Sequence, residues 1–217
     1  MLQDSMIERW MSGLISKYPD LSSCKKDIEA AYRELSSSFH SGGKLMVCGN
    51  GGSAADSEHI VGELMKGFMS KRPLGAKQRS LLEGANPTDG AYLADRLQGA
   101  LPAISLVSHS ALITAYANDV APDMIFGQQV YGLGREGDVL LALSTSGNSA
   151  NVVRAVQVAN AIGVRTIGLT GKGGGKLGEL CTVTIRVPYN LTPDIQERHL
   201  PIYHTLCMMV EQEFFEA

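Results

Sequence analysis

Residues 48–64, CGNGGSAADSEHIVGEL, decide the fold of this chain because they join three kinds of local structure. A short apolar run, KLMVC (44–48), leads into them and is typical of a buried strand. Glycines follow as a tight turn, and His59 and Glu63 then stand one helical turn apart on one face. A strand end, a turn and a helix in this order are typical of an open α/β sheet, in which ligands bind beyond the carboxyl ends of the strands.

Similar short apolar runs recur along the chain, at 102–107, 138–143, 164–169 and 183–188. Helical stretches lie between them, the clearest at 149–163. Two more helices are expected within 1–40, with a break at Pro19, and a last one from about Asp194 to the end. Continuous apolar strands that alternate with helices predict a parallel sheet covered on both faces. We therefore expect one α/β domain over 1–217, a three-layer sandwich with a five-stranded parallel sheet and an N-terminal helical pair.

Composition limits the class of protein. The 217 residues suit one sizeable domain, and the net charge of -3 with no block of like charge gives no reason to expect nucleic acid or a membrane surface as partner. The chain has no apolar run long enough to span a bilayer, and its first residues do not read as a signal peptide. Four cysteines without CxxC spacing fit free thiols in a reducing compartment, so a cytoplasmic protein is expected.

Residues 71–100 interrupt the alternation of strands and helices. They hold two prolines, four glycines and scattered apolar side chains. A connection of this length inside a compact domain is usually functional or disordered. Two interpretations stay open, a passive surface insertion and a lid over a site.

The glycine turn formally fits a dinucleotide-binding pattern, because GNGGSA (49–54) has the spacing G-x-G-x-x-G/A. That pattern also requires an acidic residue about 20 positions later, at the end of a second strand, and the residues near Ser70 supply neither feature. A second glycine-rich stretch, GKGGGK (171–176), is followed by Leu177 where a phosphate-binding loop needs Ser or Thr. We expect no nucleotide cofactor.

The stretch LALSTSGNSANVV (141–153) predicts a phosphate site. It again reads as strand, turn and helix, and the turn offers the hydroxyls of Ser144, Thr145, Ser146 and Ser149 without a lysine. Free N–H groups at a helix start favour an anion. Serine is also a common helix cap, which would explain one of these hydroxyls but not four in six residues. A small phosphate monoester is therefore the expected ligand.

Together, GNGGSAADSEH (49–59) and STSGNSANV (144–152) resemble the sugar isomerase (SIS) domain. More narrowly, the chain resembles the phosphoheptose isomerase branch of that family, which acts on sedoheptulose 7-phosphate. The resemblance covers nearly the whole chain and includes TPDIQERHLPIYH (192–204). It implies a single SIS domain, with 1–40 as N-terminal helices and 71–100 as an insertion or lid.

The resemblance implies an aldose–ketose isomerisation through an enediol, which yields a D-glycero-heptose 7-phosphate. Such a reaction needs a base for the proton beside the carbonyl and an acid for the carbonyl oxygen. Glu63 and His204 match the family's acid–base pair, with Glu63 as the base. The family's substrate contacts fall on Asn50, Gly51, Gly52, Ser53, Ser144, Thr145, Ser146, Ser149, Asp119 and Gln196.

The resemblance also implies a zinc site. Some members hold zinc with residues that match His59, Glu63, Gln196 and His204 here. Imidazole and carboxylate groups suit zinc, and an amide oxygen is an unusual fourth ligand. Considered alone, His59 would be an ordinary half-buried histidine. Family members form homotetramers with sites at subunit interfaces, so a small phosphosugar and further copies of this chain are the expected partners.

Two departures from the family pattern concern the sugar rather than the reaction. Leu106 stands where many members have an acidic residue, and the segment 75–98 is long. Other readings stay open: an isomerase of another ketose phosphate, a phosphosugar-sensing regulator, or a non-catalytic SIS protein that binds a protein such as a replication initiator. Glu63 together with His204 favours the enzyme.

Overall fold

The computed structural model describes residues 2–215 and contains one five-stranded parallel sheet. The strands lie in the spatial order β2-β1-β3-β4-β5. Each falls within one residue of an apolar run found in the sequence, so the predicted sheet is confirmed. Their bounds are β1 Leu45–Cys48, β2 Ala103–Ser105, β3 Val139–Leu143, β4 Arg165–Thr170 and β5 Val183–Arg186.

Two interior strands, β1 and β3, are buried on both faces. Side chains of β1 alternate between two apolar clusters: Leu45 and Val47 belong to one, and Met46 and Cys48 to the other. The side chains of β3 divide between the clusters in the same way. Because neither face meets water, these strands are continuously apolar instead of alternating with polar residues.

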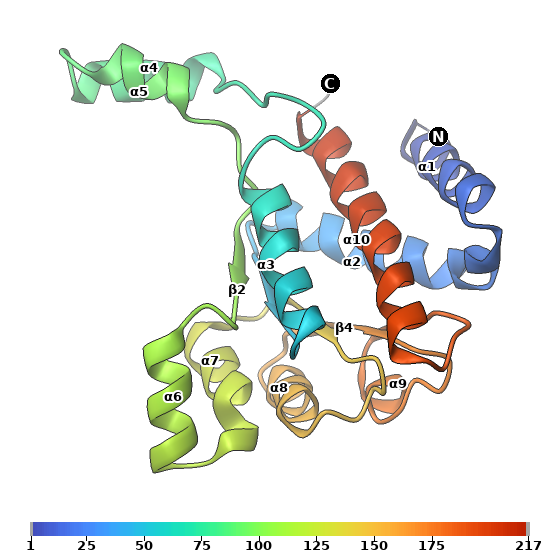
Figure 1. Cartoon of the computed structure of the whole chain (residues 1–217). Coiled ribbons are helices and arrows are strands. Elements are labelled where there is room, and N and C mark those ends of the chain that lie inside the picture. Colours follow the sequence, from blue (N-terminus) through green and yellow to red (C-terminus); the bar gives the residue numbers. More distant parts are fainter. Residues whose placement is uncertain (1, 216–217) are drawn as a thin grey trace.

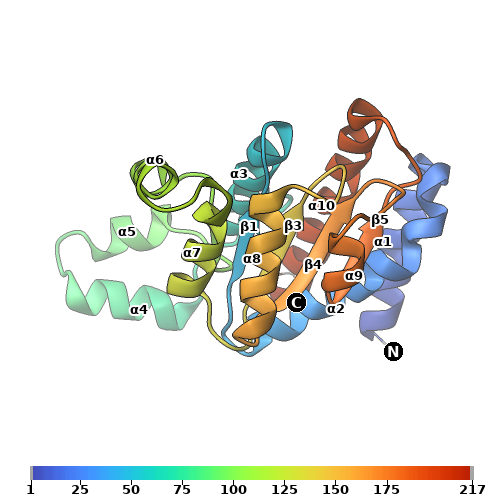
Figure 2. The same cartoon turned by 90° about the horizontal axis from the view of Figure 1, so that it is seen from below.

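Helices cover both faces of the sheet and complete the three layers (Figures 1 and 2). One face packs against α1 (Leu2–Lys17), α2 (Lys25–His40), α3 (Gly52–Met65) and α10 (Thr192–Phe215). The other packs against α7 (Ile125–Leu133), α8 (Ala150–Ala161) and α9 (Leu177–Leu180), with α6 (Ser110–Asp119) beside α7. Short 3-10 helices occupy Pro19–Cys24, where the sequence predicts a break, and Pro122–Met124.

The sheet has its topological switch point at β1. Leu45 pairs with Ala103 of β2 on one side and with Val139 of β3 on the other, both in parallel. The chain therefore leaves β1 toward one edge and returns to the opposite side of the same strand. In open α/β sheets the crevice at such a point is the usual ligand site, and here it lies between the turns that follow β1 and β3.

Residues 71–100 form a helical arm, defined here as α4 (Ala76–Ala85) and α5 (Gly90–Arg96) with their connections. The two helices pack on each other, and α4 buries none of its residues. An antiparallel bridge between Pro73 and Gln98 joins the two roots of the arm. Figure 1 shows the arm projecting away from α3 and α10, so in a single chain it does not cover these helices.

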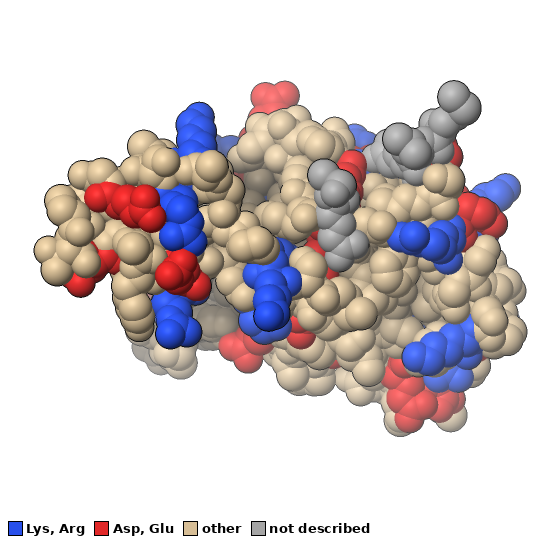
Figure 3. Space-filling model, turned by 90° about the horizontal axis from the view of Figure 1, so that it is seen from above, with Lys and Arg blue, Asp and Glu red and all other residues tan. Residues whose placement is uncertain are grey.

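The surface shows no large area of one charge on the face drawn in Figure 3, where acidic and basic side chains lie next to one another. On the arm, for example, Arg79 pairs with both Glu83 and Asp95. Among the described residues, no helix has the length and apolarity needed to cross a bilayer. The even distribution agrees with the weak net charge of the sequence.

His199 of α10 is fully buried, and neither of its ring nitrogens makes a hydrogen bond of ordinary geometry within residues 2–215. Burial lowers the pKa of His199 to about 4, and the nearby backbone of Thr170 offsets this only in part. In the unfolded chain the ring regains an ordinary pKa of about 6.5. Between these two values the unfolded state binds more protons, so stability falls as the pH falls.

We expect the unfolding free energy of the wild type to drop by up to about 3 kcal/mol through His199 as the pH falls from about 7 to about 4. Denaturant unfolding at a series of pH values measures this slope. His199→Gln removes the titrating ring and should flatten the slope, whereas His109→Gln, which changes an exposed histidine, should keep it. Equal slopes for all three proteins would contradict the assignment.

Candidate functional site

The turns after β1 and β3 lie side by side and are joined by a pair of amides. Asn50, in the first turn, and Asn151, in α8, exchange two hydrogen bonds, each 2.9 Å between nitrogen and oxygen. Asn151 Oδ1 also accepts the backbone N–H of Val152, which fixes its orientation. The amide pair therefore holds the two turns together at the switch point.

Hydroxyl groups line the second turn, with Ser144 only 4% exposed. Ser149 occupies the N-cap position of α8, yet its side chain makes no capping hydrogen bond. Its Oγ instead lies 3.0 Å from Ser144 Oγ, while Ser146 Oγ accepts the N–H of Asn148. Because the first N–H groups of a helix have no partner within the helix, the turn and the start of α8 together suit an anion.

Gly147 shapes this turn, because no side chain fits at its position. Its φ is +67, and a Cβ there would lie 1.9 Å from the carbonyl oxygen of Gly174. The backbone of this second turn, residues 144–149 and called the serine turn below, thus packs directly on the loop after β4. A second connection comes from Asn148, whose Oδ1 accepts the N–H of Lys176.

A chain of hydrogen bonds crosses from α3 to α10 and back. Tyr203 OH lies 3.1 Å from both Asp56 Oδ1 and His59 Nδ1. His59 Nε2 lies 3.1 Å from Glu63 Oε1, and Lys66 Nζ donates to Glu63 Oε2 at 3.0 Å. Both oxygens of the Glu63 carboxylate are thereby oriented. Since His59 and Glu63 are four residues apart on α3, their contact confirms that they share one helix face.

Burial acts on the ionisable groups that this chain of hydrogen bonds joins. Burial raises the pKa of Asp56 even though Tyr203 donates a hydrogen bond to it. It raises the pKa of Tyr203 as well, with Asp56 adding to the shift, so the phenol keeps its proton. Glu63 is only 8% exposed. A carboxylate in this position depends on its partners, His59 and Lys66, for stabilisation.

His204 stands beside this chain with a free nitrogen. Its ring lies 5.0 Å from that of His59, measured between centroids, and 5.4 Å from that of Phe68. His204 Nε2 is buried and has no hydrogen-bond partner within residues 2–215. Burial, with a smaller effect of His59, lowers the pKa of His204, although Glu63 opposes the shift. The imidazole is therefore neutral near pH 7, with one nitrogen left for a ligand.

The donor groups present suit zinc chemically, but they are not arranged as a finished metal site. Two imidazoles and a carboxylate lie together in His59, Glu63 and His204, and the buried, unpartnered Nε2 of His204 fits a missing ligand. Over residues 2–215, however, no group of three His, Cys, Asp or Glu side chains has a geometry that could hold a metal ion.

Other residues singled out from the sequence lie apart from these three. Gln196 contacts the start of α3, where a Cβ on Gly52 would lie 2.5 Å from its Nε2. It is two turns, roughly 12 Å of helix rise, from His204. Asp119 is exposed at the end of α6 and accepts a hydrogen bond from Asn118. Leu106 is fully buried in the second apolar cluster, so its side chain does not line a pocket.

Remaining members of the predicted substrate set lie in the two turns. Gly51 is the N-cap of α3 and has a φ of +56, while Ser53 is buried in the first turn of that helix. Thr145 holds the loop after β4 through its carbonyl oxygen, which accepts the N–H of Gly171. The two turns thus gather Asn50, Gly51, Gly52, Ser53, Ser144, Thr145, Ser146 and Ser149 at one edge of the sheet.

Sequence reasoning missed Asn151, Asp56, Lys66 and Tyr203. Asn151 and Asp56 stand inside the quoted motifs, and Lys66 follows Glu63 by three residues. Their nearness to the predicted site residues in the sequence could have revealed them. The contact of Tyr203 with His59 could not have been found in this way, because it spans 144 positions of sequence.

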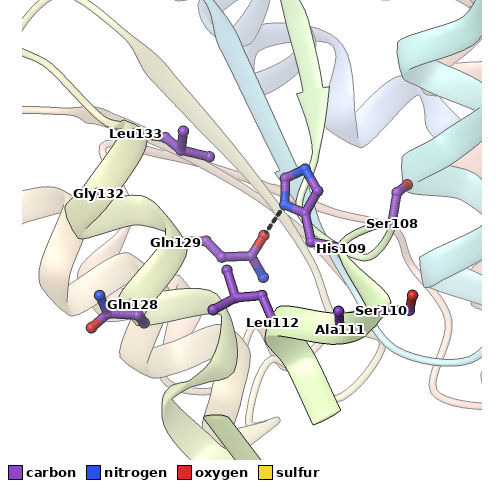
Figure 4. A pocket seen from close by; sticks show the side chains of 9 residues that line it. All are labelled: Ser108, His109, Ser110, Ala111, Leu112, Gln128, Gln129, Gly132 and Leu133. Atoms are coloured by element: carbon purple, nitrogen blue, oxygen red, sulfur yellow. Dashed lines mark hydrogen bonds between the residues drawn. The ribbon is translucent and has the colours of Figure 1, made fainter. Parts of the chain in front are cut away.

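A separate hollow of about 660 Å³ lies at the end of β2, between α6 and α7 (Figure 4). His109 and Gln129 meet there, 2.6 Å apart between Nδ1 and Oε1. Gln129 donates its two amide protons to the carbonyls of Leu106 and Ile125, so its Oε1 must accept from His109 Nδ1. Within the described residues, no hydrogen bond joins His109 to the chain from Asp56 to Lys66.

Gly147→Ala should disrupt the serine turn, since the added methyl group meets the Gly174 carbonyl and the residue is forced into a left-handed backbone. We expect a loss of about 2–4 kcal/mol in unfolding free energy and at least a tenfold weaker affinity for inorganic phosphate, measured by unfolding and by calorimetry. Gly137→Ala is the matched control, because Gly137 also has a positive φ but open space around it. Equal effects of the two substitutions would contradict the role given to the close approach.

Comparisons with known proteins show which family this chain is similar to. A family model described as SIS domain matches residues 20–104 and 93–171. The phosphoheptose isomerase of Rhodospirillum rubrum is 44% identical to this chain over 191 residues, which cover 88% of each protein. That of Akkermansia muciniphila is 36% identical over 209 residues, covering 96% of this chain and 97% of the relative.

Solved structures give the same result. The phosphoheptose isomerase of Neisseria gonorrhoeae superposes with a TM-score of 0.73 at 30% identity and covers 98% of this chain and 100% of its own. The one from Francisella tularensis has a TM-score of 0.74 at 30% identity and covers 98% and 99%. The similarity extends over nearly the whole chain in both sequence and fold.

Proposed function

The chain belongs to the SIS-domain family and, within it, to the phosphoheptose isomerases, and from this premise we propose which of its residues carry out the isomerisation. It is an aldose–ketose isomerase that acts on sedoheptulose 7-phosphate. The observation that carries the assignment of roles is the chain of hydrogen bonds from Asp56 to Lys66 beside the unpartnered nitrogen of His204.

The phosphate binds in the serine turn. Ser144 and Ser149 present their hydroxyls there, and the start of α8 supplies N–H groups and the positive end of a helix dipole. Asn50 and Asn151 keep the neighbouring turn in place, and Gln196 reaches the same region at Gly52. A phosphate held mainly by neutral donors is oriented without a strong charge that would slow product release.

Glu63 is the base that takes the proton from the carbon beside the carbonyl. Lys66 donates to one of its oxygens, and His59 is hydrogen-bonded to the other. His204 serves the carbonyl oxygen, because its buried Nε2 has no partner within the described chain. In the metal-free protein, the tautomer with its proton on Nε2 gives that proton to the carbonyl oxygen as Glu63 takes one from the carbon. The two residues then exchange roles as the enediol collapses to the aldose.

His59, Glu63 and His204 would hold zinc, with Gln196 as a candidate fourth ligand. When bound, the ion would supply positive charge beside the carbonyl oxygen. Tyr203 and Asp56 hold the His59 ring in place both with and without zinc. Tyr203 is hydrogen-bonded to the ring nitrogen that faces away from Glu63, and Asp56 is hydrogen-bonded to Tyr203. In a single chain Gln196 lies two turns of α10 from His204, so as a fourth ligand it would have to come from another copy of the chain.

A complete site requires a second copy of the chain. Glu63 lies eleven residues along α3 from Gly52, roughly 16 Å of helix rise, so one chain places its phosphate turns and its acid–base residues far apart. Large apolar side chains are exposed next to the acid–base residues, with Met65 at 47% and Met69 at 65% exposure. Such surface is typical of an interface. It supports an assembly in which neighbouring chains share sites, and the homotetramer is the form that the family resemblance implies.

Four free cysteines, three of them buried, fit a reducing compartment. Burial raises the pKa of Cys207 to about 12, so its thiol is unreactive. We place the enzyme in the cytoplasm on this ground.

Incubation of the purified protein with sedoheptulose 7-phosphate, followed by NMR, tests the proposal. We expect aldose to form, and Glu63→Gln to lower kcat at least a thousandfold while the protein still folds and binds phosphate. Turnover lost in EDTA and restored by zinc would support the metal ligands. Undiminished turnover by Glu63→Gln would overturn the role of Glu63, and a wild type that binds the sugar but never converts it would favour a partner-binding SIS protein.

A further inference from the structure

Arg72 is the largest fully buried side chain of the described structure, and it lies just beyond the acid–base residues. Its guanidinium donates Nη1 to the carbonyl of Leu64 at 2.7 Å and Nη2 to the carbonyl of Glu63 at 3.0 Å. Both carbonyls belong to the last turn of α3, where a helix has no donors of its own. Arg72 thus caps the helix end that carries Glu63, with a cation where the helix dipole favours one.

Glu211 of α10 balances the charge of Arg72. Its Oε1 accepts Arg72 Nε at 2.6 Å and the N–H of Phe68 at 2.8 Å, and its Oε2 accepts the N–H of Met69 at 2.7 Å. Burial acts to raise the pKa of Glu211, but the two N–H groups and Arg72 outweigh it and hold that pKa below its usual value. Glu211 is 1% exposed, so the pair is shielded from water.

The pair connects the two helices that carry the reacting groups. Glu211 follows His204 by seven residues, so both lie on one face of α10. Through Arg72, that face is bonded to the backbone of Glu63 itself. The segment that returns from the arm is bonded to the same region. The N–H of Gly99 donates to the carbonyl of Arg72, and the N–H of Leu101 donates to the carbonyl of Leu64.

The backbone of Arg72 is itself unusual. It is the one residue other than glycine with a positive φ, at 45, among those that the structure describes. This backbone conformation carries an energetic cost for a residue with a side chain. The contacts of the buried guanidinium offset that cost, so its position is defined by several bonds and not by one.

We propose that Arg72, held by Glu211, is a positioning residue that sets the placement of the Glu63 carboxylate relative to His204. This rests on the proposed roles of Glu63 and His204. An arginine is needed because its planar guanidinium reaches two carbonyls and a carboxylate at once, whereas a lysine ammonium is a single point charge. A small displacement of the end of α3 would move Glu63 away from the substrate carbon, and such errors reduce rates strongly.

Steady-state kinetics on Arg72→Lys and Glu211→Gln test the proposal. We expect kcat to fall about 10–100-fold with KM changed less than about threefold, since the phosphate turn is untouched. The kcat of Arg72→Met should fall further than that of Arg72→Lys, because lysine keeps the positive charge. Activity is measured well below the melting temperature of each variant, so that the folded fraction is the same.

Asp138→Asn is the matched control for lost stability. Asp138 is also buried, at 3% exposure, and just before the start of β3 it pairs with Lys44 and accepts the N–H of Arg135. We expect this variant to melt at a lower temperature yet keep the wild-type kcat. The proposal is overturned if Asp138→Asn and Arg72→Lys lose kcat in the same proportion to their loss of melting temperature. Arg72 would then have only a structural role.

A double substitution separates this inference from the proposed function. If Arg72 acts through Glu63, adding Arg72→Lys to Glu63→Gln should not lower the residual turnover further. Additive losses would overturn the inference and leave the role of Glu63 intact. Wild-type kcat in Glu63→Gln would instead overturn the proposed base, and retained kcat in Arg72→Lys with an inactive Glu63→Gln would overturn only the positioning role.

Discussion

Parallel strands place all their carboxyl ends at one edge of the sheet, and the rest of this molecule depends on that constraint. After each strand the chain must return across a face, so each return helix begins at the same edge. Because β1 is followed by β2 on one side and β3 on the other, α3 and α8 start next to each other on opposite faces of the sheet. Two helix N-termini and two turns meet there, and the turns at 49–52 and 144–149 contain no lysine or arginine.

Helix α3 connects this edge of the sheet with the buried groups at the other end of the strands. It begins at the ligand edge with Gly52 and ends among the buried groups around Arg72. Its partner α10 runs alongside, from Gln196 beside Gly52 at one end to Glu211, which accepts hydrogen bonds from the segment that follows α3, at the other. The proposed acid–base residues therefore lie toward one end of this helix pair, while its other end meets the turns in which the phosphate site is proposed.

Much of this arrangement was predictable from sequence, because burial on both faces leaves continuous apolar runs and glycines mark the turns. The serine turn was recognisable because its residues are consecutive. Contacts between distant segments were not: Tyr203 meets His59 across 144 positions and Arg72 meets Glu211 across 139. The arm was also misleading, since α4 buries no residue and therefore lacks the apolar periodicity that reveals a helix.

The roots of the arm have a consequence for how such a protein can change over time. Pro73 and Gln98 are bridged, so the chain leaves and re-enters the body at a single point. Sequence of almost any length can be added between two such neighbouring points at little entropic cost, because the closure penalty grows slowly with length. The turn between α4 and α5, residues 86–89, is thus a natural place to graft a foreign domain or a label without disturbing the sheet.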